Sequence, residues 1–132
     1  MNTTETVALR AETPAQVIAL FASCLEAGDL ELALTLYEPE AVLVPQPGQV
    51  VAGVGAIRAA LAPFFALGAR MTSDVRTVVE AGEVATVLNH WTLEGAQPDG
   101  TPRRFEATSA DVVRRQRDGR WLLVIDDPWG AS

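Results

Sequence analysis

The chain has 132 residues, 48% hydrophobic and 20% charged, which is typical of one globular domain with a packed core. Seventeen acidic residues against ten basic ones give a formal net charge of −7, and this charge argues against nucleic acid as a partner. One cysteine excludes an internal disulfide, and one cysteine with one histidine leaves too few ligands for us to expect a metal site.

The first twelve residues, MNTTETVALRAE, lack the basic start and the apolar run of a signal peptide. No segment of the sequence reaches the roughly 20 apolar residues that a membrane-spanning helix needs. We therefore expect a cytoplasmic protein without a membrane partner, formed by one domain over residues 1–132, in which residues 1–12 are a loose N-terminal arm.

Two helices are predicted after this arm. TPAQ, at residues 13–16, has Thr13 as N-cap, a proline at the first helical position and a glutamine at the capping-box position. The apolar residues that follow recur with the period of a helix, and Gly28 ends it. A second apolar stripe predicts a helix that Asp29 caps and Pro39 closes.

A hairpin and a third helix come next. AVLVPQPGQVVAG, at residues 41–53, predicts a strand, a Pro–Gly turn and a short return strand. The two prolines in this stretch indicate an edge strand or a bulge. GAIRAALAPFFALG, at residues 55–68, predicts a helix whose end is kinked or tightened by Pro63.

From Arg70 onward the apolar residues alternate instead of following a helical period. This pattern predicts four strands joined by short turns, at residues 71–80, 84–95, 103–115 and 120–127. The fold class is therefore α+β, with three N-terminal helices packed on one face of a curved, mainly antiparallel sheet.

The last strand runs into two adjacent carboxylates in VIDDPWG, residues 124–130. Side chains alternate along a strand, so one of Asp126 and Asp127 shares a face with Leu122 and Val124. That aspartate is a candidate to line the interior.

Three stretches, LEAGDLELALTLYEPEAVLVPQPG, GVGAIRAAL and DGRWLLVIDDPWG, resemble the SnoaL-like, ketosteroid-isomerase-like proteins of the nuclear transport factor two superfamily. The resemblance covers nearly the whole chain. It implies that the helices and the bent sheet form a cone with an internal apolar pocket, where a carboxylate usually transfers protons beside a hydrogen-bond donor. The superfamily includes isomerases, cyclases, dehydratases, epoxide hydrolases and binding proteins, so the fold alone does not name a reaction.

Position by position, the resemblance gives a mixed result for ketosteroid isomerase. The general base of that enzyme corresponds to Pro45 and its oxyanion tyrosine to Phe21, so its mechanism is not expected here. Its second oxyanion donor, an aspartate kept protonated by apolar surroundings, corresponds to Asp111. Tyr37 matches an auxiliary tyrosine of some isomerases.

Asp126 resembles in position a working aspartate of limonene-type epoxide hydrolases and of SnoaL-like cyclases. The epoxide hydrolases also need an arginine and a second aspartate, where this chain has Asn89 and Trp91. If Asp111 faces inward, alternation and the last turn give the other inward residues. These are Ser109 and Val113 on one strand, Leu122, Val124 and Asp126 on the next, and Val87, Asn89, Trp91 and Leu93 on the strand before.

These residues predict an acid–base enzyme for a small, largely apolar molecule, of isomerase, cyclase, dehydratase or hydrolase type, with no cofactor. Asp126 is the base, and Asp111 is a protonated donor or second acid. The predicted ligand-binding residues are Phe21, Tyr37, Leu61, Asn89, Trp91, Val113, Val124 and Trp129.

A purely structural role remains an alternative for each of these residues. Asp126 could cap the chain end near Pro128, and Asp111 could pair with a neighbouring arginine. Trp129 could cover the pocket mouth or tether the C-terminus. The alternative function is a dimeric module that binds a small ligand without chemistry, and a scaffold with a vestigial pocket comes third.

Trp121, Leu123 and Ile125 alternate with the inward set, so they are predicted on the convex face of the sheet. An exposed apolar stripe usually marks an interface, and this one predicts a homodimer through the convex face. His90, also assigned outward, is expected at the surface or at this interface.

Overall fold

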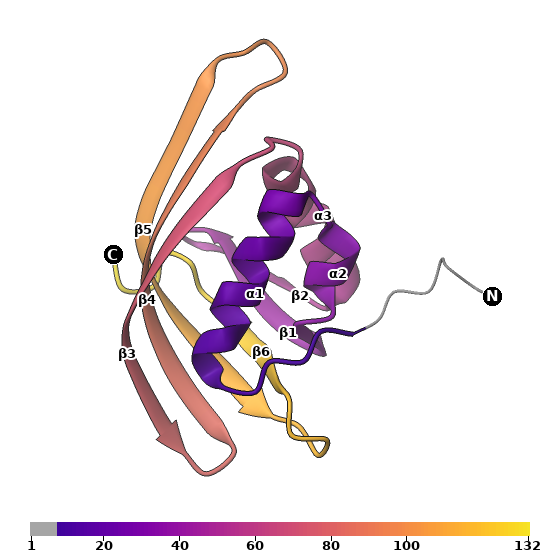
Figure 1. The fold of residues 1–132 in the computed structure, drawn as a ribbon, viewed down its shortest axis with the longest axis vertical. Coiled ribbons are helices and arrows are strands. Elements are labelled where there is room, and N and C mark those ends of the chain that lie inside the picture. The colour runs from indigo at the N-terminus through magenta and orange to yellow at the C-terminus, as the bar shows by residue number, and fades with distance from the viewer. Residues whose placement is uncertain (1–7) are drawn as a thin grey trace, which may run out of the picture.

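A computed structural model describes residues 8–132, which form three helices and a six-stranded sheet (Figure 1). The sheet is curved and open, and the helices lie on its concave side. In chain order the elements are α1 (Pro14–Ala27), α2 (Leu30–Leu34), β1 (Tyr37–Gln46), β2 (Gln49–Ala52), α3 (Val54–Phe65), β3 (Arg70–Ala81), β4 (Val84–Ala96), β5 (Pro102–Arg115) and β6 (Trp121–Asp126). This order confirms the predicted α+β class, while the cone stays a prediction.

The strands lie in the order β2-β1-β6-β5-β4-β3. Neighbouring strands are antiparallel except β1 and β6, which run parallel. The last strand therefore lies in the middle of the sheet, between the N-terminal hairpin and the three long strands. This position brings the C-terminal carboxylates next to residues from both halves of the chain.

The start of α1 follows the predicted capping pattern with one shift. The Thr13 side chain accepts a hydrogen bond from the Gln16 backbone N–H. The Gln16 side chain accepts from the N–H of Glu12, one residue before the cap (2.7 Å). Gly28 ends the helix with a φ of 70°, a left-handed conformation that costs glycine little.

The second helix is shorter than predicted. It ends at Leu34, and Tyr37 begins β1, so the prediction of a helix closing at Pro39 is wrong. The spacing of apolar residues fits a helix up to Tyr37, but Tyr37 pairs with Leu123 of β6. Pairing and burial in the sheet therefore override the local period in this segment.

Part of the predicted N-terminal arm, residues 1–7, lies outside the described residues. Two hydrogen bonds attach the residues just before α1 to the domain. The Leu9 backbone N–H donates to Thr35 Oγ1 at 3.1 Å, and the Ala11 carbonyl accepts from the Trp121 backbone N–H at 2.9 Å. Ala11 is fully buried. This short segment thus packs against the first residue of β6 and the residue that follows α2.

The core lies between the helices and the concave face of the sheet. Its fully buried members come from most elements and include Val17, Leu43, Ile57, Val87 and Val113. Among the helices of residues 8–132, none is both long and apolar enough to cross a bilayer.

A bulge in β6 inverts the alternation of its side chains. Val113 pairs with Leu123 while Val112 pairs with Ile125, so Val124 is an extra residue without a partner on β5. An extra residue of this kind turns all following side chains to the other face. Leu123 and Asp126 therefore both face the interior, although they are three positions apart.

The register of β6 with β5, together with the bulge, corrects two sequence predictions. Leu122 and Val124 do not share the inner face with Asp126, and Trp121 and Leu123 are not on the convex face. Trp121 and Leu123 are 3% and 2% exposed and belong to the core. Of the three residues predicted for the convex stripe, Ile125 is the one that is exposed.

Candidate functional site

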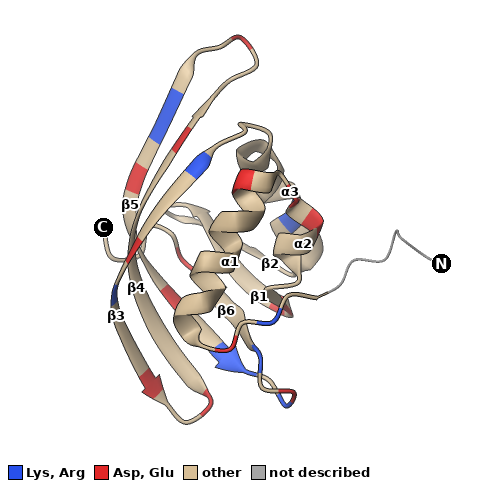
Figure 2. Ribbon diagram, viewed as in Figure 1, with Lys and Arg blue, Asp and Glu red and all other residues tan. Residues whose placement is uncertain are grey.

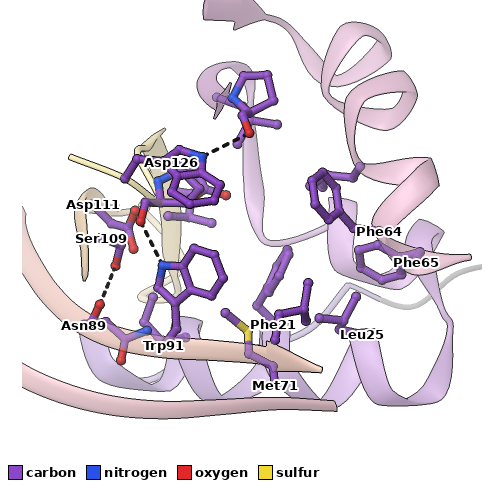
Figure 3. A pocket seen from close by; sticks show the side chains of 18 residues that line it. Phe21, Leu25, Phe64, Phe65, Met71, Asn89, Trp91, Ser109, Asp111 and Asp126 are labelled. Carbon is purple, nitrogen blue, oxygen red and sulfur yellow. Dashed lines mark hydrogen bonds between the residues drawn. The ribbon is translucent and has the colours of Figure 1, made fainter. Parts of the chain in front are cut away.

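A pocket opens between α1, α3 and the inner face of the sheet, with a volume of about 90 Å³ (Figure 3). Each of the two helices contributes three apolar side chains, which we call the apolar wall: Ile18, Phe21, Leu25, Leu61, Phe64 and Phe65. Met71 and Leu93 extend this lining from the strands. The volume is below the roughly 150 Å³ of a cavity known to take benzene, so the pocket suits a ligand of few atoms or one that displaces a side chain.

The opposite side of the pocket is polar. We call this region the polar end and define it as Tyr37, Asn89, Ser109, Asp111 and Asp126. Figure 3 shows Asn89, Ser109 and Asp111 next to one another, across the pocket from Phe64 and Phe65. Asn89, Ser109 and Asp111 are buried polar side chains that line this pocket.

Regular pairing of β4 with β5 explains this gathering. Asn89 pairs with Ser109 and Val87 with Asp111, and paired residues point to the same face. Asp126 enters from β6, next to β5 in the sheet. Three neighbouring strands, β4, β5 and β6, thus place polar side chains together at the polar end of the pocket.

The carboxyl groups of Asp111 and Asp126 interact directly. Both line the pocket, and each shifts the pKa of the other. The Tyr37 hydroxyl donates to Asp126 Oδ2, and the Asp127 backbone N–H donates to Asp111 Oδ1 at 2.9 Å.

Burial separates the protonation states of these groups. It raises the pKa of Asp111 well above its ordinary value, and the charge of Asp126 raises this pKa further. Burial also raises the pKa of Asp126, but hydrogen bonds from Tyr37 and Asp111 oppose that rise. The rise is larger for Asp111, so Asp111 holds a proton to higher pH than Asp126 does.

Tyr37 remains a neutral donor in this arrangement. Burial raises the pKa of its phenol well above the ordinary value, and the neighbouring Asp126 raises it again. The polar end thus combines one neutral phenol donor, Tyr37, with two carboxyl groups whose pKa values are raised.

The structure places the arginines of β5 away from Asp111. Arg114 forms an ion pair with Glu38 at 2.9 Å and Arg115 with Glu83 at 2.6 Å. These arginines lie at the end of β5, the blue arrowhead in Figure 2. Within residues 8–132, no ion pair includes Asp111, so the alternative of an arginine partner is not realised.

Two tryptophans hold the C-terminal segment over the pocket. Trp91 Nε1 donates to the Pro128 carbonyl at 2.8 Å, and Trp129 Nε1 donates to the Pro45 carbonyl at 3.0 Å. Their rings meet edge to face with centroids 5.3 Å apart. Trp129 therefore both lines the pocket and tethers the chain end.

Seven of the ten residues predicted for the site line the pocket: Phe21, Leu61, Asn89, Trp91, Asp111, Asp126 and Trp129. Tyr37 does not line it but bonds to Asp126. Val113 is fully buried in the core, and Val124 is the bulge residue without a partner on β5. These two residues are not brought to the site.

Sequence reasoning missed part of the lining. Ser109 was assigned inward but not to the site, although it follows from the same alternation as Asp111. Ile18 and Leu25 share the helical face of Phe21, so the period of α1 contained the signal. In residues 8–132, no three His, Cys, Asp or Glu side chains are grouped so that they could hold a metal ion.

The SnoaL-like domain family matches residues 17–124 of this chain. No curated protein sequence matches it significantly. Solved structures with the same arrangement include a ketosteroid isomerase-like protein from Erwinia carotovora atroseptica, at 14% identity and a TM-score of 0.73, over 85% of this chain and 88% of that one.

Two further structures are similar. A candidate dehydratase of the NTF2-like family from Streptomyces avermitilis has 20% identity and a TM-score of 0.70, over 85% of this chain and 89% of that one. A candidate calcium/calmodulin-dependent protein kinase II association domain from Xanthomonas campestris has 23% identity and a TM-score of 0.71, over 96% and 94%. At these identities the likeness establishes the fold alone.

Proposed function

Because this chain belongs to the SnoaL-like domain family, we propose that its pocket binds a small, largely apolar molecule and moves a proton on it by carboxylate chemistry. One observation carries the proposal. A pair of interacting carboxyl groups, held by a buried tyrosine, lies at the polar end of an otherwise apolar pocket. Taking such a pair out of water costs free energy of folding. Carboxyl groups with strongly shifted pKa values are found most often at functional sites.

Asp126 is the general base in this proposal. It lines the pocket, its pKa is raised less than that of Asp111, and its Oδ2 is held by the Tyr37 hydroxyl. It takes a proton from the substrate, and Tyr37 and Asp111 remain beside it as neutral donors. A carboxyl group with a raised pKa is better matched to proton transfer near neutral pH than a free one.

The proton taken by Asp126 can have several fates. Its return to another atom is isomerisation, and its removal with loss of a hydroxide equivalent is dehydration. Cyclisation and hydrolysis start from the same base. The similarity to a candidate dehydratase and to a ketosteroid isomerase-like protein supports this group of reactions.

The steroid isomerase mechanism is not part of the proposal. Pro45 and Phe21, which stand where that enzyme has its base and its tyrosine, both line the pocket and have no group that transfers protons. A volume of about 90 Å³ is also too small for a steroid unless the pocket widens.

The same two residues favour a second candidate, a binding module without chemistry. In that case Asp111, Asp126 and Tyr37 would form a closed network that only shapes the polar end. The two candidates differ in whether Asp126 exchanges protons with a bound molecule.

Exchange of α-hydrogens for deuterium tests this difference without knowledge of the final product. The protein is incubated in D₂O with small ketones such as cyclopentanone, and ¹H NMR follows the loss of the α-hydrogen signal. We expect exchange above the buffer rate with the wild-type protein and none with Asp126→Asn. Binding without exchange in the wild type would favour the binding module.

We also propose a homodimer through the convex face, now with different residues. In the strand register, Val42, Val112 and Ile125 share that face, and Leu88 lies beside them on β4. Sedimentation at micromolar concentration tests this, with Ile125→Arg expected to give a monomer. A wild-type monomer would contradict the proposal.

The cytoplasmic location stays a prediction from the sequence.

A further inference from the structure

The side-chain amide of Asn89 is a buried polar group that the proton transfer proposed above does not use. Asn89 is 1% exposed and lines the pocket, and its Oδ1 has no hydrogen-bond partner within the described residues. A buried acceptor without a partner costs free energy, and such atoms are rare in native structures.

The hydroxyl on the residue paired with Asn89 already has another acceptor. Ser109, paired with Asn89 across the sheet, donates its hydroxyl to the backbone carbonyl of Asn89 at 3.3 Å. The inward neighbours of Asn89 on β4 are Val87 and Trp91, so an apolar side chain would suit this position in a sheet. The amide therefore lacks a role in packing that would explain its burial.

We propose that Asn89 selects the substrate: its amide oxygen accepts a hydrogen bond from a hydroxyl or N–H group that the substrate carries beside its reacting centre. This inference rests on the proposed function and narrows its substrate class. The substrate is a small molecule with an apolar body against Phe21 and Phe64, a reacting carbon facing Asp126, and a donor group facing Asn89.

A site built to accept a hydrogen bond discriminates against ligands that lack the donor, because its own polar atom is then left unpaired. Asn89 thus acts as a specificity-determining residue. A β-hydroxy ketone has the required groups, since its hydroxyl is the donor and its α-hydrogen is the proton that Asp126 would take.

Two matched probes test the inference, 3-hydroxycyclopentanone and cyclopentanone, which differ in one hydroxyl group. Binding is followed by tryptophan fluorescence, because Trp91 and Trp129 line the pocket, and in ¹⁵N-labelled protein by the side-chain amide signal of Asn89. The chain has two asparagines, Asn2 and Asn89, so this signal can be identified by its loss in Asn89→Leu. We expect the hydroxy probe to bind about 10- to 100-fold more tightly, and the amide signal to shift with that probe.

Asn89→Leu and Asn89→Val should both abolish the preference, so that the two probes bind each variant with similar affinity. Thr92→Val is the matched control, because Thr92 lies on the outer face of the same strand, and it should keep the preference. A second readout separates this inference from the proposed function. The inference is overturned, and the proposed function stands, if the wild type exchanges α-hydrogens but binds the two probes equally. The same conclusion follows if it exchanges α-hydrogens but binds each probe no more tightly than the Asn89 variants do. If the preference is present without exchange, Asn89 selects a ligand and the proposed proton transfer fails.

Discussion

The two sides of the pocket are built by different means and have opposite effects on the fold. The apolar wall comes from α1 and α3, and its rings pack edge to face, with Phe21 and Phe65 centroids 5.9 Å apart. The polar end comes from the strands and buries Asn89 and Asp111 in the same low-dielectric space. The wall contributes to stability as any core does, whereas the polar end reduces stability. Residues that a fold retains at such a cost mark the region selected for function.

The largest expected effect concerns activity at the polar end. Asp126→Asn keeps the shape and still accepts a hydrogen bond from Tyr37, but it cannot take a proton. We expect deuterium exchange on the preferred ketone to fall by about 10²- to 10⁴-fold, the usual contribution of a general base. Asp127→Asn is the control, because Asp127 is adjacent but does not line the pocket. Equal losses in the two variants would contradict the inward assignment of Asp126.

The wall should show the opposite profile, with a large effect on stability. Phe65 is 8% exposed and contacts Phe21, so Phe65→Ala should lower the free energy of unfolding by about 3–5 kcal/mol. Val50→Ala, at a residue 64% exposed, should change it by less than about 0.5 kcal/mol. Urea denaturation measures both. If Phe65→Ala behaves like Val50→Ala, the wall is not packed as described.

Removal of the unpaired amide should have a smaller effect of the opposite sign. Asn89→Leu replaces a buried acceptor without a partner by an apolar group of similar size. The free energy of unfolding should rise by about 1–3 kcal/mol in the absence of ligand. A marked loss of stability in the same urea experiment would mean that Asn89 supports the fold and that the cost assigned to the polar end is wrong.

The smallest effect is a change in pH dependence. Folding raises the pKa of Asp111 and of Asp126. The stability linked to these groups is fully present below the unfolded pKa of about 3.9 and is lost as pH rises through the folded pKa values. Asp111→Asn removes one of the two groups, so its stability should fall less than that of the wild type over this range. Parallel pH profiles of urea midpoints for the two proteins would contradict the raised pKa of Asp111.

The sequence contained most of the fold and part of the site. Element order, the capped start of α1 and the inward face of β4 and β5 followed from local patterns, because β4 and β5 pair without interruption. Asp111 could therefore be placed by alternation from its neighbours.

The last strand could not be read in this way. Residues 121–125 are all apolar, so no alternation shows which face is which, and neither the hairpin register nor the bulge at Val124 leaves a pattern. The predicted phase was off by one residue at Leu122, and the bulge shifts the strand by one residue. The two deviations cancel at Asp126. Its side chain faces inward as predicted, although the prediction did not include the bulge.

Direct titration of the aspartate carboxyl groups by ¹³C NMR tests the central claim, that Asp111 and Asp126 interact as an acid and a base at the polar end. In the wild type, the pKa of Asp111 should lie well above the ordinary value of about 3.9. In Asp126→Asn it should fall, because the neighbouring charge is gone while burial remains. If Asp111 titrates near 3.9 in both proteins, the two carboxyl groups do not form a functional pair, and the proposed chemistry is wrong.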